Sequence, residues 1–268
     1  MQAVSADTLI ISDVHLGSDL SRAREALRLI KHSSFQRLIL LGDIFADLNF
    51  SRLKKDHWRF LSQIRKLSNP KRGIEVVWVE GNHDQGLATL MSHLVGVRVY
   101  QEYTWTFAGL RHLAIHGHQF DQFAINRVRL SRFGTLVHLQ LQKLDSEKKR
   151  FSRLLDGLNT RWLRLSAKVS KGALEHARRR GIDRIFCGHT HIAMEAERDG
   201  VRYYNSGSWV GVPPTFITVG EEGVRIHQYA GIDDRDPCQE RSDVAAKAAD
   251  LADETDLFAE PEDEGVRC

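Results

Sequence analysis

Two histidines separated by one residue, His189 and His191, lie near the end of the segment RIFCGHTHI, residues 184–192. The apolar run before them is typical of a buried strand, and Gly188 marks the point where the strand gives way to a loop. In open α/β sheets, ligands bind at the carboxyl ends of the strands. The two imidazoles therefore stand where a metal ion or a substrate can be bound.

Side chains that bind metals follow the other predicted strands as well. TLIIS precedes Asp13 and His15, RLILLG precedes Asp43, IEVVWVEG precedes Asn82, His83 and Asp84, and LAIHGHQFD carries His116 and His118. Residues from several strands can converge at one sheet edge. Carboxylate, imidazole and amide oxygen together form a donor set suited to Mn²⁺, Fe²⁺ or Zn²⁺, and no thiolate belongs to it.

The spacing favours two ions over one. In a tight loop, Asp13 and His15, or His189 and His191, can converge on neighbouring ions, and a single carboxylate such as Asp43 can bridge them. Two ions about 3.5–4 Å apart can activate a shared hydroxide and hold phosphoryl oxygens for an in-line displacement. The predicted chemistry is hydrolysis of a phosphoester or a phosphoanhydride.

Five segments, DVHLG, GDIFAD, GNHD, HGH and GHTH, occur in the order of the motifs of the calcineurin-like metallophosphoesterase superfamily. From about Thr8 to Tyr229 the chain resembles that family. The resemblance implies an α/β fold with two mixed β-sheets flanked by helices, here with a helical insertion, and two divalent ions. It implies that the first ion is bound by Asp13, His15, Asp43 and His191. It implies that the second ion is bound by Asp43, Asn82, His116 and His189.

The resemblance also gives His83 a catalytic role, in which it contacts the phosphoryl group or protonates the leaving oxygen while Asp84 orients its ring. For His118, two interpretations stay open: a residue that supports the ligands, or a turn residue. Five histidines that lack a motif are expected at the surface or in the core: His57, His93, His112, His138 and His176.

Within the superfamily, the segment HGHQFD and a helical insertion between the fourth and fifth motifs are similar to the UDP-2,3-diacylglucosamine pyrophosphatases of lipid A synthesis. This resemblance implies cleavage of the pyrophosphate bond to UMP and 2,3-diacylglucosamine 1-phosphate, with Mn²⁺ as the expected cofactor and the insertion covering the acyl chains. The chain departs from these enzymes at His83, where they usually have arginine, and it lacks the S-x-x-N-x-x-K pattern of their insertion.

Two other functions stay open. The same ions can serve another phosphodiesterase or phosphatase, in which the insertion only shapes the entrance. A nuclease or nucleic-acid-binding protein can use a basic insertion to track phosphates. Nucleic acid is the less expected partner, because the insertion has few aromatic residues to stack on bases, namely Phe123, Phe133, Phe151 and Trp162.

The elements that position these residues alternate in type. Helical patterns from about Asp19 to His32 and from about Ser51 to Ser68 lie between the first three strand patterns, which indicates βαβ units and a largely parallel sheet. A turn is predicted at Ala108-Gly109, and two hairpins are predicted at Asp199-Gly200 and Glu222-Gly223. The segment from about Asp121 to Arg180 has helical apolar spacing and is the predicted insertion.

Charge is unevenly distributed along the chain. The predicted insertion, residues 121–180, contains fifteen Lys or Arg against five Asp or Glu. Its leucines and phenylalanines can face a lipid, while its cations meet phosphates or an anionic membrane surface. From Asp233 onward, acidic residues stand among small residues, which predicts a disordered tail. We expect a metallophosphoesterase domain over residues 1–232 and an acidic tail over residues 233–268.

Composition indicates a soluble, cytoplasmic protein that can contact the cytoplasmic face of the membrane. No apolar run approaches the roughly 20 residues of a membrane span. TLIIS has the length of a strand and is followed by Asp13, unlike the apolar region of a signal peptide. Three widely spaced cysteines suit a reducing compartment. No obligate protein partner is inferred.

Overall fold

Parallel strands form the centre of the first of two sheets. The computed structural model describes residues 4–121, 149–210 and 213–230, and all of its elements lie within the unit Gln2–Ala230. The first sheet has six strands in the order β11-β10-β1-β2-β3-β4. They are β1 (Thr8–Ile11), β2 (Arg37–Leu41), β3 (Glu75–Val79), β4 (Val99–Tyr100), β10 (Thr215–Gly220) and β11 (Gly223–Gln228). Strands β1 to β4 are parallel, and β10 and β11 pair antiparallel.

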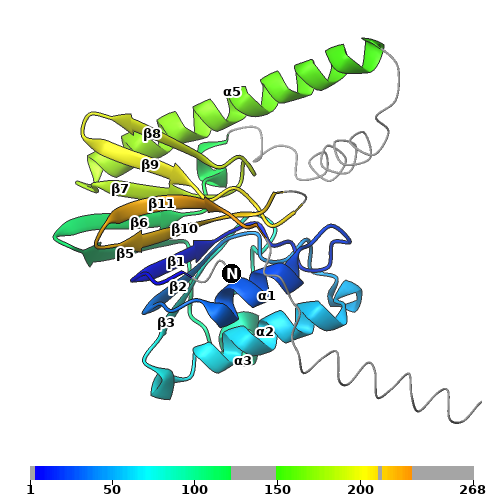
Figure 1. Cartoon of the computed structure of the whole chain (residues 1–268), viewed down its shortest axis with the longest axis vertical. Coiled ribbons are helices and arrows are strands. Elements are labelled where there is room, and N and C mark those ends of the chain that lie inside the picture. Colours follow the sequence, from blue (N-terminus) through cyan, green and yellow to red (C-terminus); the bar gives the residue numbers. More distant parts are fainter. Residues whose placement is uncertain (1–3, 122–148, 211–212, 231–268) are drawn as a thin grey trace, which may run out of the picture. The chain divides into compact units, whose positions relative to one another are not determined.

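Three helices accompany this sheet (Figure 1). They are α1 (Ala23–His32), α2 (Lys55–Leu67) and α3 (Ala88–Leu94), with the short 3₁₀ helices η1 (Phe50–Arg52) and η2 (Pro70–Arg72). Helix α1 joins β1 to β2, and α2 joins β2 to β3. The predicted βαβ pattern is therefore confirmed. The Val, Ile and Leu runs of β1 to β3 are typical of strands that are buried on both faces.

The second sheet has five strands in the order β5-β6-β7-β9-β8. They are β5 (Glu102–Phe107), β6 (Leu110–Ile115), β7 (Arg184–Cys187), β8 (Met194–Arg198) and β9 (Val201–Asn205). Strands β6, β7 and β9 are parallel, and β5 and β8 pair antiparallel at the two edges. The predicted turns at Ala108-Gly109 and Asp199-Gly200 close two hairpins of this sheet. The turn between β10 and β11 lies at residues 221–222, one residue before the predicted position.

Apolar side chains from both sheets form one core between them. Ile10 and Val77 of the first sheet belong to the same buried cluster as Ala114 and Phe186 of the second. The Phe186 ring stacks on that of Tyr204, with ring centroids 5.4 Å apart. The fold class predicted from the sequence, two mixed sheets flanked by helices, is confirmed.

Helix α5 (Lys149–Arg179) covers the second sheet. Its Ala173 and Ala177 pack with Leu113 and Ile185 in a second buried cluster. This helix falls within the predicted insertion. Residues 122–148 of the insertion and the predicted tail lie outside the described residues, so the domain boundaries stay predictions.

None of the helices in the described part of the chain is both long enough and apolar enough to cross a membrane.

Candidate metal centre

The predicted ligands lie on loops that follow strands of both sheets. Their metal-binding atoms form three groups, each with all atoms within 4.8 Å of one another: Asp13, His15 and His191; His15, Asp43 and His83; and Asp43, His116 and His189. His15 and Asp43 each belong to two groups, so the three groups are continuous. The structure thus brings together six of the seven predicted ligands and His83.

One oxygen of each aspartate fixes a neighbouring loop. The His189 N–H donates to Oδ2 of Asp13 over 3.1 Å, which joins a loop of the second sheet to one of the first. The His83 N–H donates to Oδ1 of Asp43 over 2.8 Å. In addition, the His15 N–H donates to the backbone carbonyl of Asp43 over 3.1 Å. These bonds hold both carboxylates still and leave the second oxygen of each turned toward imidazoles.

The second oxygens lie close to imidazole nitrogens. Oδ1 of Asp13 is 3.1 Å from Nε2 of His191 and 3.8 Å from Nε2 of His15, and those two nitrogens are 3.2 Å apart. Oδ2 of Asp43 is 3.3 Å from Nε2 of His116. Carboxylate oxygens and imidazole nitrogens that converge in this way offer lone pairs to a shared cation.

Asn82, the seventh predicted ligand, has a buried side-chain oxygen. Its Oδ1 is buried and accepts no hydrogen bond from the described residues. Oδ1 of Asp13 and Nε2 of His116 are likewise buried without a hydrogen bond. Buried polar atoms normally have partners, and a cation would provide one for all three. The residues present therefore fit a divalent metal centre.

The backbone is left-handed at five of the predicted ligands. Positive φ angles occur at Asp13 (52°), His15 (48°), Asp43 (50°), His189 (68°) and His191 (57°). For residues other than glycine this conformation costs about 1–3 kcal/mol each, and it persists where the surrounding structure enforces it. The sharp turns after β1, β2 and β7 therefore aim these side chains into the site.

Two glycines allow the loops to approach this closely. A Cβ atom at Gly81 would overlap the backbone nitrogen and Oδ1 of Asp43, and one at Gly42 would overlap the ring of His116. Only glycine avoids both overlaps. The glycines in the GD and GNHD segments are therefore part of the construction of the site.

The site side chains perturb one another strongly. Burial alone would raise the pKa of Asp13, but His191 and His15 hold it well below its usual value. Burial would also raise the pKa of Asp43, which His116 and His83 instead lower. The His116 pKa is raised to about 9, because the charge of Asp43 outweighs the effect of burial. Both carboxylates are thus held ionised, as cation binding requires.

His83 lies at the rim of the site with its ring held by a backbone carbonyl. Nδ1 is 2.7 Å from the Ala46 carbonyl oxygen, and Nε2 is 3.8 Å from Oδ2 of Asp43. The prediction that Asp84 orients this ring is wrong. The Asp84 carboxylate instead accepts hydrogen bonds from two backbone N–H groups of the loop after β2.

Those donors are the N–H groups of Ile44 and Phe45, which reach Asp84 over 3.0 and 2.9 Å. Burial and the charge of Asp43 raise the pKa of Asp84 to about 7. Asp84 therefore supports the loop that carries Asp43.

His118 begins the short helix η3 (His118–Phe120) and also lies beside the predicted ligands. Its ring centroid is 5.5 Å from that of His116 and 6.3 Å from that of His189. Burial, followed by the charge of His116, lowers the His118 pKa to about 3. His118 belongs to none of the three ligand groups. It lies beside the ligands, as a supporting residue would, and it begins a short helix, as a turn residue would.

Polar side chains that were not predicted from the sequence hydrogen-bond to the loops of the site. Asn205 Nδ2 donates to the Gly188 carbonyl over 2.7 Å, and Ser206 Oγ donates to Ser12 Oγ over 2.7 Å. Asp121, predicted only as the start of the insertion, lies against His189. The place of Asn205 and Ser206 in the sequence could have revealed them. They lie at the end of β9, just as the predicted ligands lie after their strands.

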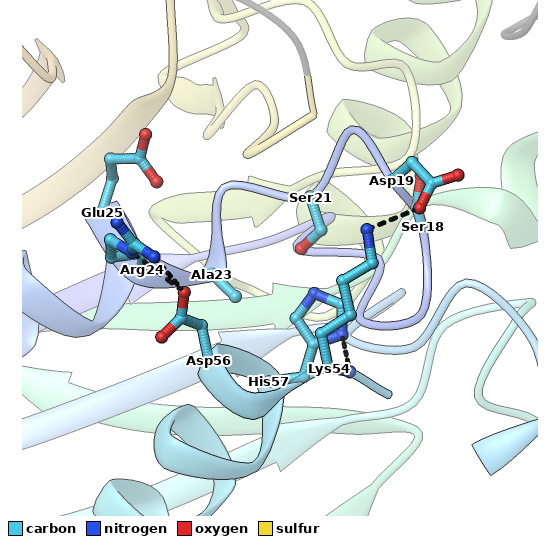
Figure 2. A pocket seen from close by; sticks show the side chains of 9 residues that line it. All are labelled: Ser18, Asp19, Ser21, Ala23, Arg24, Glu25, Lys54, Asp56 and His57. Carbon is cyan, nitrogen blue, oxygen red and sulfur yellow. Dashed lines mark hydrogen bonds and ion pairs between the residues drawn. The ribbon is translucent and has the colours of Figure 1, made fainter. Parts of the chain in front are cut away.

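A polar pocket of about 260 Å³ adjoins the loop after β1 (Figure 2). His57 Nδ1 accepts the N–H groups of Gly17 and Lys54 there, over 3.2 and 3.1 Å. Lys54 also pairs with Asp19. None of the predicted ligands lines this pocket, and His57 belongs to none of the three groups. The three ligand groups also contain none of His93, His112 and His176. His138 lies outside the described residues.

Residues 7–222 match the model of the calcineurin-like phosphoesterase superfamily domain. The chain belongs to this superfamily. It is therefore a metal-dependent phosphoesterase, and its His and Asp groups are the candidates for binding the divalent ions that the superfamily uses. None of the curated proteins compared with the chain matches it.

Solved structures similar to this chain include a phosphoesterase, a phosphodiesterase and a Vps29 protein. The Escherichia coli phosphoesterase YfcE is 16% identical with a TM-score of 0.47, over 81% of this chain and 90% of that one. An archaeal phosphodiesterase is 16% identical with a TM-score of 0.44, over 82% and 98%. Zn²⁺-bound Vps29 from Entamoeba histolytica is 14% identical with a TM-score of 0.39, over 82% and 97%. Because these sequence identities and TM-scores are low, the assignment to the superfamily rests on the match to the domain model alone.

Proposed function

We propose that this phosphoesterase is a dinuclear enzyme with Asp43 as the carboxylate that bridges its two ions. The continuity of the three ligand groups through Asp43 and His15 carries the proposal. The first ion would be held by Asp13, His15, Asp43 and His191, and the second by Asp43, Asn82, His116 and His189. Mn²⁺ is the expected ion, with Fe²⁺ or Zn²⁺ as alternatives, because the donor set contains no thiolate.

Ions bound in such a site lower the pKa of water and neutralise charge on phosphoryl oxygens. The protein supplies the orientation of the ligands. It also supplies His83, whose Nδ1 faces the Ala46 carbonyl and therefore carries a proton. Nε2 then donates a hydrogen bond only when the ring is an imidazolium. We propose that His83 in this form contacts the phosphoryl group or protonates the leaving oxygen.

For the substrate we propose UDP-2,3-diacylglucosamine, which hydrolysis would convert to UMP and 2,3-diacylglucosamine 1-phosphate. The segment HGHQFD and the insertion, which includes the long helix α5, support this proposal. The basic residues of the insertion suit the phosphates of a nucleotide lipid, or the anionic cytoplasmic face of a membrane.

A second candidate is another phosphodiesterase or phosphatase activity at the same ions. The observation that favours it is His83, which stands where the lipid A enzymes usually have arginine. A nuclease is a third and weaker candidate because of the few aromatic residues in the insertion.

Substrate comparison separates these candidates. With Mn²⁺ supplied, we expect turnover of UDP-diacylglucosamine to exceed that of bis(p-nitrophenyl) phosphate and of single-stranded DNA. Shortening both acyl chains by two carbons should lower kcat/KM, because each buried methylene contributes about 0.8 kcal/mol. Turnover of the small diester without turnover of the lipid would refute the lipid substrate and leave the phosphoesterase assignment in place.

Metal removal tests the dinuclear centre itself. Exhaustive chelation should abolish activity, and Mn²⁺ should restore it best among the divalent ions. Metal content measured before and after chelation should fall from two ions per chain to none. Full activity in the metal-free protein would contradict the proposal.

A further inference from the structure

A carboxylate outside the predicted ligand set lies against His189. Oδ2 of Asp121 is 3.4 Å from Nε2 of His189, and the Asp121 residue is only 5% exposed. Asp121 belongs to none of the three ligand groups. A buried carboxylate is unfavourable unless it is paired or hydrogen-bonded, so its place beside this imidazole calls for a role.

The contact occupies one of the two ring nitrogens of His189. Because Nε2 faces Asp121, Nδ1 is the nitrogen left for an ion. His116 shows the same division, since its Nδ1 lies 2.9 Å from the Leu41 carbonyl oxygen and its Nε2 faces Asp43. Histidines that bind metals generally donate their other N–H to a carboxylate or a carbonyl, which fixes the tautomer and the ring orientation.

Asp121 is itself held in place by helix α5. Its N–H donates to the His118 carbonyl over 3.1 Å at the end of η3. Phe120 of η3 packs on α5 so closely that a Cβ atom at Gly172 would lie 3.0 Å from the Phe120 Cβ. The Phe120 ring also lies 5.6 Å from that of His176 on the same helix. The carboxylate is therefore carried by a packed segment next to the site.

We propose that Asp121 is a positioning residue, which accepts the Nε2 proton of His189 and so turns Nδ1 toward the second ion. The inference rests on the proposed dinuclear centre and extends it to a residue outside the predicted ligands. Removal of Asp121 should weaken one ion site selectively. A protein without the Asp121 carboxylate should have a lower metal affinity, because Asp121 acts through His189.

Mn²⁺ titration of the metal-free full-length chain tests this role, with free Mn²⁺ measured by electron paramagnetic resonance. The parent should bind two ions. Asp121→Ala should bind one ion with unchanged affinity and the other about 10–100-fold more weakly. Asp121→Asn should lose less, since its amide oxygen still accepts the Nε2 proton. Saturating Mn²⁺ should restore kcat in Asp121→Ala.

Asp183→Asn is the matched control. Its Oδ2 accepts the Arg111 N–H over 2.7 Å just before β7 begins, at the opposite end of that strand from His189. This variant should bind both ions with parent affinity. Parent affinity at both sites in Asp121→Ala, or equal weakening of both, would overturn the positioning role. A parent protein that binds fewer than two ions would instead refute the dinuclear centre, and this inference with it.

Discussion

At the scale of single residues, Asp43 and His83 are neighbours with different expected roles. Asp43 faces His116 through one oxygen and binds the His83 N–H through the other, whereas the His83 ring is fixed by Ala46. Loss of Asp43 would therefore remove a ligand from both proposed ions. Loss of the His83 side chain would leave the ligands in place.

We therefore expect Asp43→Ala to lose both ions and nearly all activity. His83→Ala should keep both ions and lose about 10²–10⁴-fold in kcat, the usual contribution of a positioned proton donor. Metal analysis of the two purified variants, together with their kinetics, checks this division of roles. Equal metal loss in both variants would refute it.

The close approach of the Gly81 backbone to Asp43 gives a second prediction. Gly81→Ala should destabilise the protein by about 1–3 kcal/mol and reduce its metal content, because the new methyl group would overlap Asp43. Gly220→Ala is the control, since the nearest atom to its Cβ would be 4.0 Å away. Urea unfolding should show little change for the control, and similar stability of both variants would contradict the argument.

At the scale of elements, β6 carries a buried histidine that is not a predicted ligand. The His112 ring packs between Trp105 and Phe186, with centroid distances of 4.9 and 5.8 Å, and neither ring nitrogen has a hydrogen-bond partner among the described residues. Burial, followed by the charge of Arg184, lowers the His112 pKa from 6.5 to about 4. The folded protein therefore keeps this ring neutral.

This pKa shift predicts a loss of stability in acid. Between about pH 6.5 and 4, the unfolded chain binds a proton at His112 that the folded chain does not. Stability should therefore fall as the pH falls, by at most about 1.4 kcal/mol per pH unit from this residue. His112→Leu should flatten the dependence relative to the parent, as measured by urea unfolding at several pH values. Parallel pH profiles for the two proteins would contradict the prediction.

At the scale of the whole molecule, the acidic residues that follow Asp233 contrast with the basic insertion. Chain with such composition contributes little apolar surface to a core. A protein truncated after Asp233 should therefore keep its unfolding temperature and its turnover. Calorimetry and kinetics of the truncated chain check this expectation, and loss of soluble expression would count against it.

The sequence by itself determined the order of β1 to β3 and their helices, the turn at Ala108-Gly109 and the placement of metal-binding residues after strands. These features depend on apolar periodicity and turn residues within a few positions of one another, so a local pattern is sufficient to reveal them. The family motifs then indicated which of those residues belong together.

Only the tertiary structure decided which atoms meet. His15 and His191 are 176 positions apart, and their contact depends on how two sheets pack, which no local pattern records. The same reason explains why Asp84 was assigned to His83 although it binds the Ile44 and Phe45 N–H groups instead. It also explains why Asp121 was missed, because η3 and α5 bring it to His189 from 68 positions away.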